Sequence, residues 1–328
     1  MTNKKIIWQT EKAGFEEAVE YLKGRALGAI QSMRTPWKSF NSATVDGLEW
    51  SSMTVIAGRP ASGKTAILQH LIRDAMEINS TQRMRVLNFQ LEMPKRSLAI
   101  REFSAAADLS YKQLCSAGGY NLSATELEKI AKYAELRIKY PIDVVDESCS
   151  VNDFKDIVHS YMLAHKTDKG YTNTLVTIDH SILLKQDSFE RDKTAMLYNL
   201  GEALTLLKKR YPIAFVVLSQ LNREAEDPSR NEDGKYGNYV LESDIFGGDA
   251  LLQHADTVIG VKRPLKYNIK IYGPEKYIIN DRDIMAFHFL KCRNGETGIA
   301  WFKGNFARMQ VLETSTPPQQ ERITVKNK

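Results

Sequence analysis

The sequence predicts an α/β fold in which a mainly parallel, twisted sheet is flanked by helices. Short apolar runs with strand character alternate with longer segments of helical spacing along the chain. One strand-to-helix junction, over residues 58–65, is rich in small residues and glycine. The chain has 328 residues, enough for one large domain or two ordinary domains with a buried core.

Composition and charge argue against a secreted protein and against a membrane protein. The net charge of +5 is mild, so it permits a polyanionic partner without requiring one. Cys115, Cys149 and Cys292 are widely spaced without a C-x-x-C pair, which favours a reducing setting: the cytoplasm, or the host cytoplasm if the protein is viral. The N-terminus lacks the apolar stretch of a signal peptide, and the longest apolar run, 213–218, is too short to cross a bilayer. We therefore expect no membrane partner.

The first predicted element is a linker-like amphipathic helix within residues 1–33, over residues 11–33. Apolar residues recur there at three- and four-residue steps among charged ones. They are Phe15, Ala18, Val19, Leu22, Leu27 and Ile30. Two partners for this apolar stripe stay open at this point, the helix's own domain and a neighbouring subunit.

Six strands are predicted, and helices separate most of them. The strand candidates are 53–57, 85–91, 142–145, 174–178, 213–218 and 257–261. Helical spacing occupies 66–76, 95–139 with an interruption at Gly118 and Gly119, 151–165 and 194–210. This alternation favours parallel strands joined by crossover helices. Residues 224–240 are interpreted as a long surface loop, and the polar residues 313–328 as a disordered tail.

Residues 58–65 read Gly-Arg-Pro-Ala-Ser-Gly-Lys-Thr, which is the G-x-x-x-x-G-K-[ST] pattern of a phosphate-binding loop, or P-loop. Gly58 and Gly63 let backbone N–H groups approach phosphate at the N-terminus of the following helix. Lys64 is expected to reach the β- and γ-phosphates of ATP, and the Thr65 hydroxyl is expected to hold Mg²⁺. The predicted nucleotide-binding residues are Gly58, Arg59, Pro60, Ala61, Ser62, Gly63, Lys64, Thr65 and Ala66.

Three polar residues follow other predicted strands, where an open parallel sheet binds its ligands. Asp179 is expected to hold Mg²⁺ directly or through water, and its alternative is an ordinary strand-ending aspartate. Glu92 is placed to orient or deprotonate an attacking water, although the helix dipole also favours a glutamate at a helix start. Gln220 ends the fifth strand, where its amide could sense the γ-phosphate.

Taken together, these segments resemble the ATPase domain of the DnaB-type replicative helicases, which belong to the RecA-like class. The likeness covers residues 34–312 in the family's order. Its segments are 34–40 (Arg-Thr-Pro-Trp-Lys-Ser-Phe), the P-loop, 89–93 (Phe-Gln-Leu-Glu-Met) with Arg101, 176–180 (Val-Thr-Ile-Asp-His), 218–223 (Leu-Ser-Gln-Leu-Asn-Arg), Ala255-Asp256 and 291–295 (Lys-Cys-Arg-Asn-Gly). The segments at 218–223 and 291–295 are the most specific for this family.

The resemblance implies a RecA-like ring, usually of six subunits, that hydrolyses ATP with Mg²⁺ and moves 5′→3′ along single-stranded DNA during replication. A primase or a helicase loader is a candidate partner. By motif position Glu92 matches the catalytic glutamate, Asp179 the Walker B acid and Gln220 the coupling glutamine. Lys291 and Arg293 match the basic pair that reaches a neighbour's γ-phosphate, a role that suits an always-charged guanidinium. Without the resemblance, solvated charges before an Asn-Gly turn would be the favoured interpretation of both residues.

The chain departs from the family's pattern in two places. Residues 1–33 leave room for the linker-like helix but not for the family's N-terminal domain. The family's DNA-facing Arg-Glu-Ser-Gly loop is replaced by Phe-Gly-Gly-Asp at residues 246–249. DNA contacts are therefore predicted at Phe246 by stacking, at Gly247 and Gly248 through backbone N–H groups, and at Arg223. Core packing is the alternative for Phe246.

Basic and aromatic residues alternate over residues 262–283, which look like an insertion in the family's pattern. The basic residues are Lys262, Arg263, Lys266, Lys270 and Lys276, and the aromatic ones are Tyr267, Tyr272 and Tyr277. This mixture suits single-stranded nucleic acid, and the alternative is a solvated hairpin.

Three functions stay open from the sequence alone. The first is a ring-forming, ATP-dependent DNA helicase, which the segment 291–295 favours. The second is a RecA-like recombination or mediator ATPase that forms filaments on DNA. The third is an ATP-controlled assembly protein without motor activity, and an intact set of Lys64, Glu92, Asp179 and Gln220 counts against it.

Overall fold

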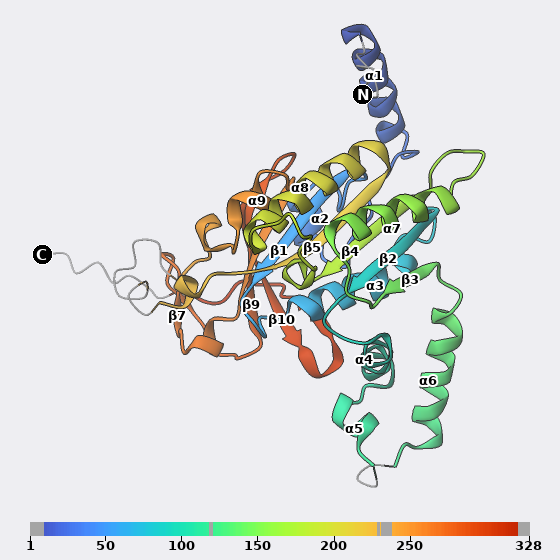
Figure 1. Ribbon diagram of the computed structural model, residues 1–328. Coiled ribbons are helices and arrows are strands. Elements are labelled where there is room, and N and C mark those ends of the chain that lie inside the picture. The colour runs from blue at the N-terminus through green and yellow to red at the C-terminus, as the bar shows by residue number, and fades with distance from the viewer. Residues whose placement is uncertain (1–9, 118–120, 228–229, 231–237, 321–328) are drawn as a thin grey trace, which may run out of the picture.

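The computed structural model describes residues 10–117, 121–227, 230 and 238–320. They form a nine-stranded sheet with helices on both faces (Figure 1), in the strand order β11-β10-β9-β6-β1-β5-β4-β2-β3. The strands are β1 Ser52–Gly58, β2 Met84–Gln90, β3 Ile142–Val145, β4 Asn173–Asp179, β5 Ile213–Gln220, β6 Thr257–Lys262, β9 Ile284–Cys292, β10 Gly298–Asn305 and β11 Gln310–Glu313. The helices are α1 Glu11–Ala26, α2 Lys38–Ala43, α3 Lys64–Ile78, α4 Lys95–Ala107, α5 Tyr111–Cys115, α6 Ala124–Arg137, α7 Val151–Ala164, α8 Lys193–Arg210 and α9 Gly248–Leu252.

The six predicted strands form the parallel part of the sheet, which confirms the predicted fold class. Gly58 at the end of β1 is in register with Gln220 at the end of β5. Gln90 at the end of β2 is in register with Asp179 at the end of β4. The carboxyl ends of these four strands therefore lie side by side at one edge of the sheet, where ligands of open α/β sheets bind.

Strands β9, β10 and β11 extend the sheet in antiparallel fashion, and the sequence analysis did not predict them. Strand β9 pairs with β6 so that Cys292 lies opposite Thr257 and Ala286 lies opposite Lys262. Because β9 runs antiparallel to β6, β9 ends on the side of the sheet where the parallel strands begin. The P-loop lies on the opposite side, where the parallel strands end.

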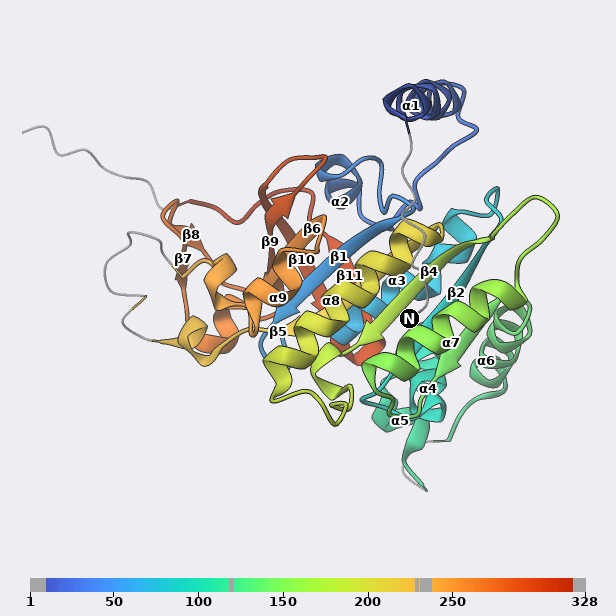
Figure 2. The ribbon, with the colours of Figure 1, turned by 45° about the horizontal axis from the view of Figure 1, so that its top comes forward.

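Two apolar layers hold the helices on the sheet. Figure 2 shows α7 and α8 lying across one face, where Phe154 and Leu204 are fully buried. Helix α3 packs on the other face through Ile67 and Leu71, beside Trp37 from the segment before α2. Each such side chain contributes about 1.5–3 kcal/mol when fully buried. These layers fix the strand ends that carry the site.

Helix α1 projects from the rest of the molecule (Figure 1) and buries none of its residues. It ends at Ala26 and does not continue to residue 33 as predicted, because the chain turns at Gly28, where φ is +70°. Phe15 and Leu22 on the predicted apolar stripe are 66% and 65% exposed. The stripe therefore does not pack on its own domain.

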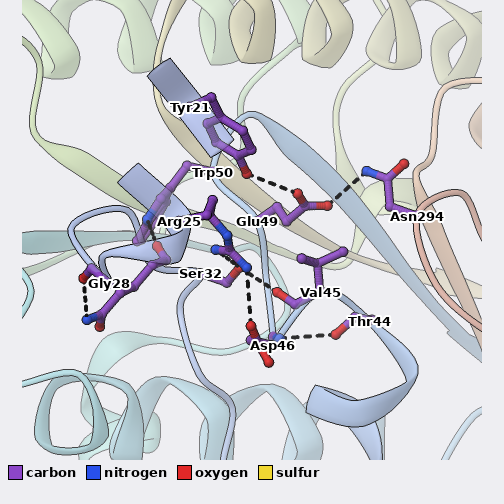
Figure 3. A network of polar contacts seen from close by, with 12 residues as sticks. Tyr21, Arg25, Gly28, Ser32, Thr44, Val45, Asp46, Glu49, Trp50 and Asn294 are labelled. Carbon is purple, nitrogen blue, oxygen red and sulfur yellow. Dashed lines mark hydrogen bonds and ion pairs between the residues drawn. The ribbon is translucent and has the colours of Figure 1, made fainter. Parts of the chain in front are cut away.

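Polar contacts attach the last turns of α1 to the segment before β1 (Figure 3). Arg25 donates hydrogen bonds to Ser32 Oγ at 3.0 Å and to Asp46 Oδ2 at 3.2 Å. Tyr21 donates to Glu49, whose other carboxylate oxygen accepts from Asn294. The core begins within the predicted linker, because Ser32 and the following methionine are buried.

The folded domain continues beyond residue 313, where the sequence analysis placed the start of the tail. The carboxylate of Glu313, at the end of β11, accepts the backbone N–H groups of Lys38 at 2.7 Å and Ser39 at 3.0 Å, and so caps the start of α2. Ile278 N–H donates to the Gln319 carbonyl oxygen at 2.7 Å. Residues up to 320 thus pair with the folded domain, and residues 321–328 of the predicted tail lie outside the described residues.

The stretch 262–283 is only in part the solvated hairpin that the sequence offered as an alternative. Lys266, Lys270 and Lys276 are exposed, whereas the three tyrosines are buried or half-buried. The stretch contains a short two-stranded sheet, β7 Ile271–Tyr272 and β8 Tyr277–Ile278. Tyr272 is fully buried in a small core with Ile279 and Trp301. Burial lowers the pKa of Lys262 to about 8, and its amine donates to backbone carbonyls. Tyr272 therefore serves packing, and Lys262 serves internal hydrogen bonding.

Candidate nucleotide site

A cavity of about 400 Å³ opens at the carboxyl edge of the parallel strands. Residues from six separate parts of the chain meet there. The lining residues are Pro60, Ala61, Gly63, Lys64, Thr65, Ala66, Glu92, Met93, Arg101, Asp179, His180, Gln220, Arg263, Phe306 and Met309. The structure thus brings together Lys64, Thr65, Glu92, Asp179 and Gln220, which the sequence analysis selected from four different segments.

The P-loop joins β1 directly to α3. Gly63 caps α3 with φ +99°, and a Cβ there would lie 2.5 Å from the Phe306 ring. A Cβ on Gly58 would lie 2.3 Å from Ser62 Oγ. Both positions therefore require glycine. Gly63 requires it for its positive φ, and at both positions a Cβ would clash with neighbouring atoms.

Lys64 is buried at the start of α3. Its amine donates to the carbonyl oxygens of Gly58 at 2.6 Å and Arg59 at 3.1 Å. Burial lowers the pKa of Lys64 to about 8, and the negative charges of Asp179 and Glu92 oppose this shift. A phosphate group entering the cavity would supply the anionic partner that two neutral carbonyls do not.

Not every residue of the predicted loop faces the cavity. Pro60, Ala61 and residues 63–66 line it, whereas Gly58, Arg59 and Ser62 do not. The guanidinium of Arg59 points to the segment after β5, where it contacts Glu226 and the Leu221 carbonyl. The side chain of Arg59 therefore lies outside the cavity.

Asp179 is buried, and burial raises the pKa of its carboxyl group to about 6. Its Oδ2 accepts a hydrogen bond from Gln90 Nε2 at 3.2 Å, while its Oδ1 is buried without a hydrogen-bond partner. An unpaired carboxylate oxygen beside Thr65 and Lys64 fits a bound cation. No group of three or more His, Cys, Asp or Glu able to hold a metal occurs among the described residues. Mg²⁺ with a nucleotide needs only one or two protein ligands, so the donor set fits that ion.

Glu92 and Gln220 border the same cavity from β2 and β5. Leu91 N–H donates to the Asp179 carbonyl oxygen at 2.9 Å, which sets Glu92 directly beyond the paired ends of β2 and β4. Gln220 is held by its register with Gly58. A carboxylate and an amide thus line the same cavity as the P-loop residues, a combination that suits a water-directed hydrolytic reaction.

Lys291 and Arg293 lie apart from this cavity, at the amino edge of the sheet. Lys291 donates to the Leu252 carbonyl oxygen, and Arg293 Nη1 donates to Asp256 Oδ1 at 2.9 Å. Asp256 Oδ2 in turn accepts the N–H of Met53, near the start of β1, at 2.8 Å. The length of β1, at roughly 3.3 Å per residue, separates these side chains from the P-loop of their own chain.

The predicted DNA-contacting residues lie beside β5. Phe246 packs partly against the core cluster of α8, which supports the packing alternative for its side chain. Its N–H donates to the Gln220 carbonyl oxygen at 2.9 Å. Gly247 has φ +59°, and Gly248 begins α9. Arg223 is exposed at the start of a short 3₁₀ turn, Arg223–Glu226.

Arg263 and Phe306 also line the cavity, although neither was predicted from the sequence as a residue of the nucleotide site. The Arg263 guanidinium lies 3.9 Å from the centre of the Phe306 ring, and both line the cavity. Arg263 directly follows β6, so the rule that ligands lie beyond parallel strand ends could have found it. Phe306 follows the antiparallel strand β10, and no motif in the sequence marks it.

None of the helices in the described part of the chain is long and apolar enough to cross a membrane.

Comparisons with known proteins agree with this architecture. A family model described as the DnaB-like helicase C terminal domain matches residues 32–310. The replicative DNA helicase DnaB of Haemophilus influenzae is 24% identical over 268 residues, which is 81% of this chain and 52% of that protein. DnaB of Pasteurella multocida is 24% identical over 292 residues, 88% of this chain and 57% of that protein. The chain thus spans about half the length of these relatives.

Two solved structures show the same fold. One, an isolated ATPase domain, superposes with a TM-score of 0.74 at 17% identity, covering 92% of this chain and 98% of that one. The other, a DnaB-like replicative helicase described with its interactions with primase, superposes with a TM-score of 0.71 at 17% identity, covering 92% of this chain and 66% of that one. With the match of the family model over most of its length, the chain belongs to the DnaB-like helicase C-terminal domain family.

Proposed function

We propose that this chain is the ATP-hydrolysing subunit of a ring-shaped helicase that moves along single-stranded DNA during replication. The observation that carries the proposal is the separation of two halves of a hydrolytic site. Lys64, Glu92 and Asp179 line one cavity, whereas Arg293 lies at the opposite edge of the sheet. If Arg293 is the arginine that acts at the transferred phosphoryl group, it must therefore act in the site of a second copy.

Each residue of the cavity would have its own role in ATP binding or hydrolysis. Lys64 binds the β- and γ-phosphates of ATP, and the backbone of residues 58–65 wraps the phosphates at the start of α3. Thr65 and the unpaired oxygen of Asp179 would hold Mg²⁺, which neutralises phosphate charge when bound. Glu92 orients the attacking water and takes its proton, and Gln220 contacts the γ-phosphate from β5.

The neighbouring copy would complete each site with Lys291 and Arg293. Arg293 is half exposed, so its guanidinium keeps donors available while one of them holds Asp256. A planar, permanently charged group next to the γ-phosphate stabilises the charge that develops there during transfer. Six copies in a ring would give every P-loop such a partner.

The exposed stripe of α1 supports assembly of copies. Phe15 and Leu22 are largely exposed on a helix that buries no residue of its own chain. A neighbouring subunit would provide the apolar surface that the helix does not find on its own chain. Because the chain spans about half of its DnaB relatives, a primase or loader contact is proposed only by analogy with the relative described with primase.

Steady-state ATP turnover, measured with no DNA, with single-stranded DNA and with duplex DNA, tests this function. We expect single-stranded DNA to stimulate turnover more than duplex, and the stimulation to weaken steeply with salt as counterions are released. Equal stimulation by duplex would favour a recombination or mediator ATPase. Turnover that no nucleic acid changes would favour an assembly protein without motor activity.

A further inference from the structure

We propose that Glu226 is a positioning residue that couples the P-loop to the segment beside Phe246. It acts through the side chain of Arg59 and touches neither nucleotide nor DNA. The DNA-dependent part of this inference rests on the proposed helicase function. Its structural part, that Glu226 carries the effect of bound nucleotide from the P-loop to residues 244–248, does not.

Arg59 connects the P-loop to the turn Arg223–Glu226. Its Nε lies 2.6 Å and its Nη2 3.4 Å from the two carboxylate oxygens of Glu226. Its Nη1 donates to the Leu221 carbonyl oxygen at 2.9 Å. Three donors of one planar group therefore hold two points of the segment that leaves β5, which fixes its orientation more firmly than a single contact would.

The pair is partly shielded from water, and it is electrostatically matched. The side chains of Arg59 and Glu226 are 18% and 32% exposed. Hydrogen bonding to Arg59 lowers the pKa of the Glu226 carboxyl group, so the glutamate stays charged at neutral pH. A displacement of residue 59 by phosphate in the loop would therefore pull on Glu226.

A second element holds the same junction. Lys266, from the stretch after β6, donates to the Pro60 carbonyl oxygen at 2.6 Å. Tyr267 lies beside Glu226, and its burial together with the negative charge of Glu226 raises the pKa of the tyrosine to about 12. Glu226 thus sits where the P-loop, the end of β5 and the stretch after β6 converge.

The other side of the segment after β5 is bound to the residues before α9. Phe246 N–H donates to the Gln220 carbonyl oxygen, Asn222 N–H donates to the Asp244 carbonyl oxygen, and Leu221 pairs with Ile245. These backbone contacts place residues 220–222 and 244–246 alongside each other as a short ladder. Gly247 and Gly248 follow this ladder directly.

The contacts form a continuous path from the P-loop through Arg59 and the turn Arg223–Glu226 to the ladder. Gln220 lines the nucleotide cavity, so it senses the same occupancy at the start of the segment. Among the described residues that line the cavity, neither Arg59 nor Glu226 occurs. Their contact can therefore be removed without removing a group that binds the nucleotide.

The test compares Glu226→Ala with a matched control, Glu224→Ala. Glu224 lies on the same turn and is exposed, so its substitution removes an equal charge two residues away. Hydrogen exchange of the full chain is measured with and without ADP and Mg²⁺. In the parent and the control, nucleotide should slow exchange in the P-loop and in residues 221–226 and 244–248. In Glu226→Ala, nucleotide should still slow exchange in the P-loop, but the slowing at residues 221–226 and 244–248 should be smaller than in the parent. It should not vanish, because the Arg59–Leu221 and Gln220–Phe246 hydrogen bonds remain.

ATP turnover gives the second readout, with and without a single-stranded oligothymidine. We expect Glu226→Ala to keep basal turnover within about twofold of the parent and to lose about fivefold or more of the DNA stimulation, the lower end of a typical coupling between sites. Adding Glu226→Ala to Arg59→Met should cause no further loss of stimulation, because Arg59→Met already removes the contact with Glu226 together with the hydrogen bond to the Leu221 carbonyl oxygen.

Three results would overturn the inference. One is an exchange response at 244–248 that is as large in Glu226→Ala as in the parent, or that the parent lacks. Another is a loss of basal turnover in Glu226→Ala as large as its loss of stimulated turnover, which would mark a role in shaping the P-loop. The third is additive effects of the two substitutions. If nucleotide slows exchange at 244–248 in the parent but the oligothymidine does not stimulate its turnover, the helicase proposal would be contradicted. The proposed coupling between the P-loop and residues 244–248 would still stand.

Discussion

Arg293 and Asp256 form an ion pair, with Nη1 and Oδ1 2.9 Å apart, at the edge of the sheet opposite the P-loop of their own chain. Lys208 on α8 also donates to Asp256, and Met53 N–H on β1 donates to the same carboxylate. The carboxylate thus ties the arginine to β1, the strand whose other end becomes the P-loop. The arginine that we propose for a neighbour's site is therefore anchored to the strand that builds its own.

Lys64→Ala and Glu92→Gln should fail in different ways. Removing the Lys64 amine removes the phosphate-directed charge, so ATP turnover should be abolished while the melting temperature stays unchanged. Glu92→Gln should still bind nucleotide but should lose about 10²-fold or more of its turnover, because an amide cannot take the proton of the attacking water. Titration with a fluorescent ADP analogue and a turnover assay measure both. A Glu92→Gln protein with the parent's turnover would remove Glu92 from its proposed role.

Deleting residues 1–20 should weaken oligomerisation without destabilising the monomer. The deletion spares the contacts of Tyr21 and Arg25 with the domain, and α1 has no buried residue to lose. Burial of Phe15 on a neighbour would contribute about 1.5–3 kcal/mol. Size-exclusion chromatography with light scattering and thermal denaturation measure the two effects.

Point substitutions on α1 provide the control for the deletion. Phe15→Ser with Leu22→Ser should reproduce the loss of oligomer, whereas Glu16→Ser with Glu20→Ser should not. A truncated protein that keeps the parent's oligomeric size would show that α1 contributes nothing to assembly.

His288 should make stability depend on pH below neutrality. It is buried, which lowers its pKa to about 3 from the ordinary value of 6.5, and its Nε2 lies 2.7 Å from the Tyr272 hydroxyl. The folded chain keeps this histidine neutral while the unfolded chain protonates it below pH 6.5. Its stabilising contribution is therefore complete above pH 6.5 and is lost as pH falls towards 3, by up to about 1.4 kcal/mol per unit.

Urea denaturation at a series of pH values between 7.5 and 5, with His288→Gln as the comparison, measures that dependence. The difference in free energy of unfolding between parent and variant should shrink as pH falls. Parallel curves for the two proteins would show that His288 does not titrate on unfolding.

The parallel half of the fold and the centre of the site were predictable because their signals are local. Each parallel strand is a short apolar run, and Asp179, Glu92 and Gln220 follow such runs directly. The P-loop needs Gly58 and Gly63 for steric reasons that the motif itself records. Residues at strand ends therefore met in one cavity as expected.

Features that depend on long-range packing were not predictable. Helix α1 carries an apolar stripe, yet nothing in its periodicity shows that the stripe is exposed. The aromatic residues near Tyr272 resembled part of a nucleic-acid surface, but Tyr272 is fully buried in a small core with Trp301, which comes from a distant strand. The Arg59–Glu226 contact joins residues 167 positions apart and has no local pattern.

The central claim is that each ATP site is shared by two subunits, and mixing two inactive variants tests it most directly. Arg293→Ala and Lys64→Ala should each lose about 10³-fold or more of the parent's turnover, as is typical when transition-state charge is missing. In mixed rings, some boundaries join the intact P-loop of an Arg293→Ala subunit to the intact arginine of a Lys64→Ala subunit. Turnover should therefore recover measurably on mixing, once exchange of differently labelled subunits has been confirmed. Confirmed exchange without any recovery would mean that Arg293 serves its own chain, and would contradict the account.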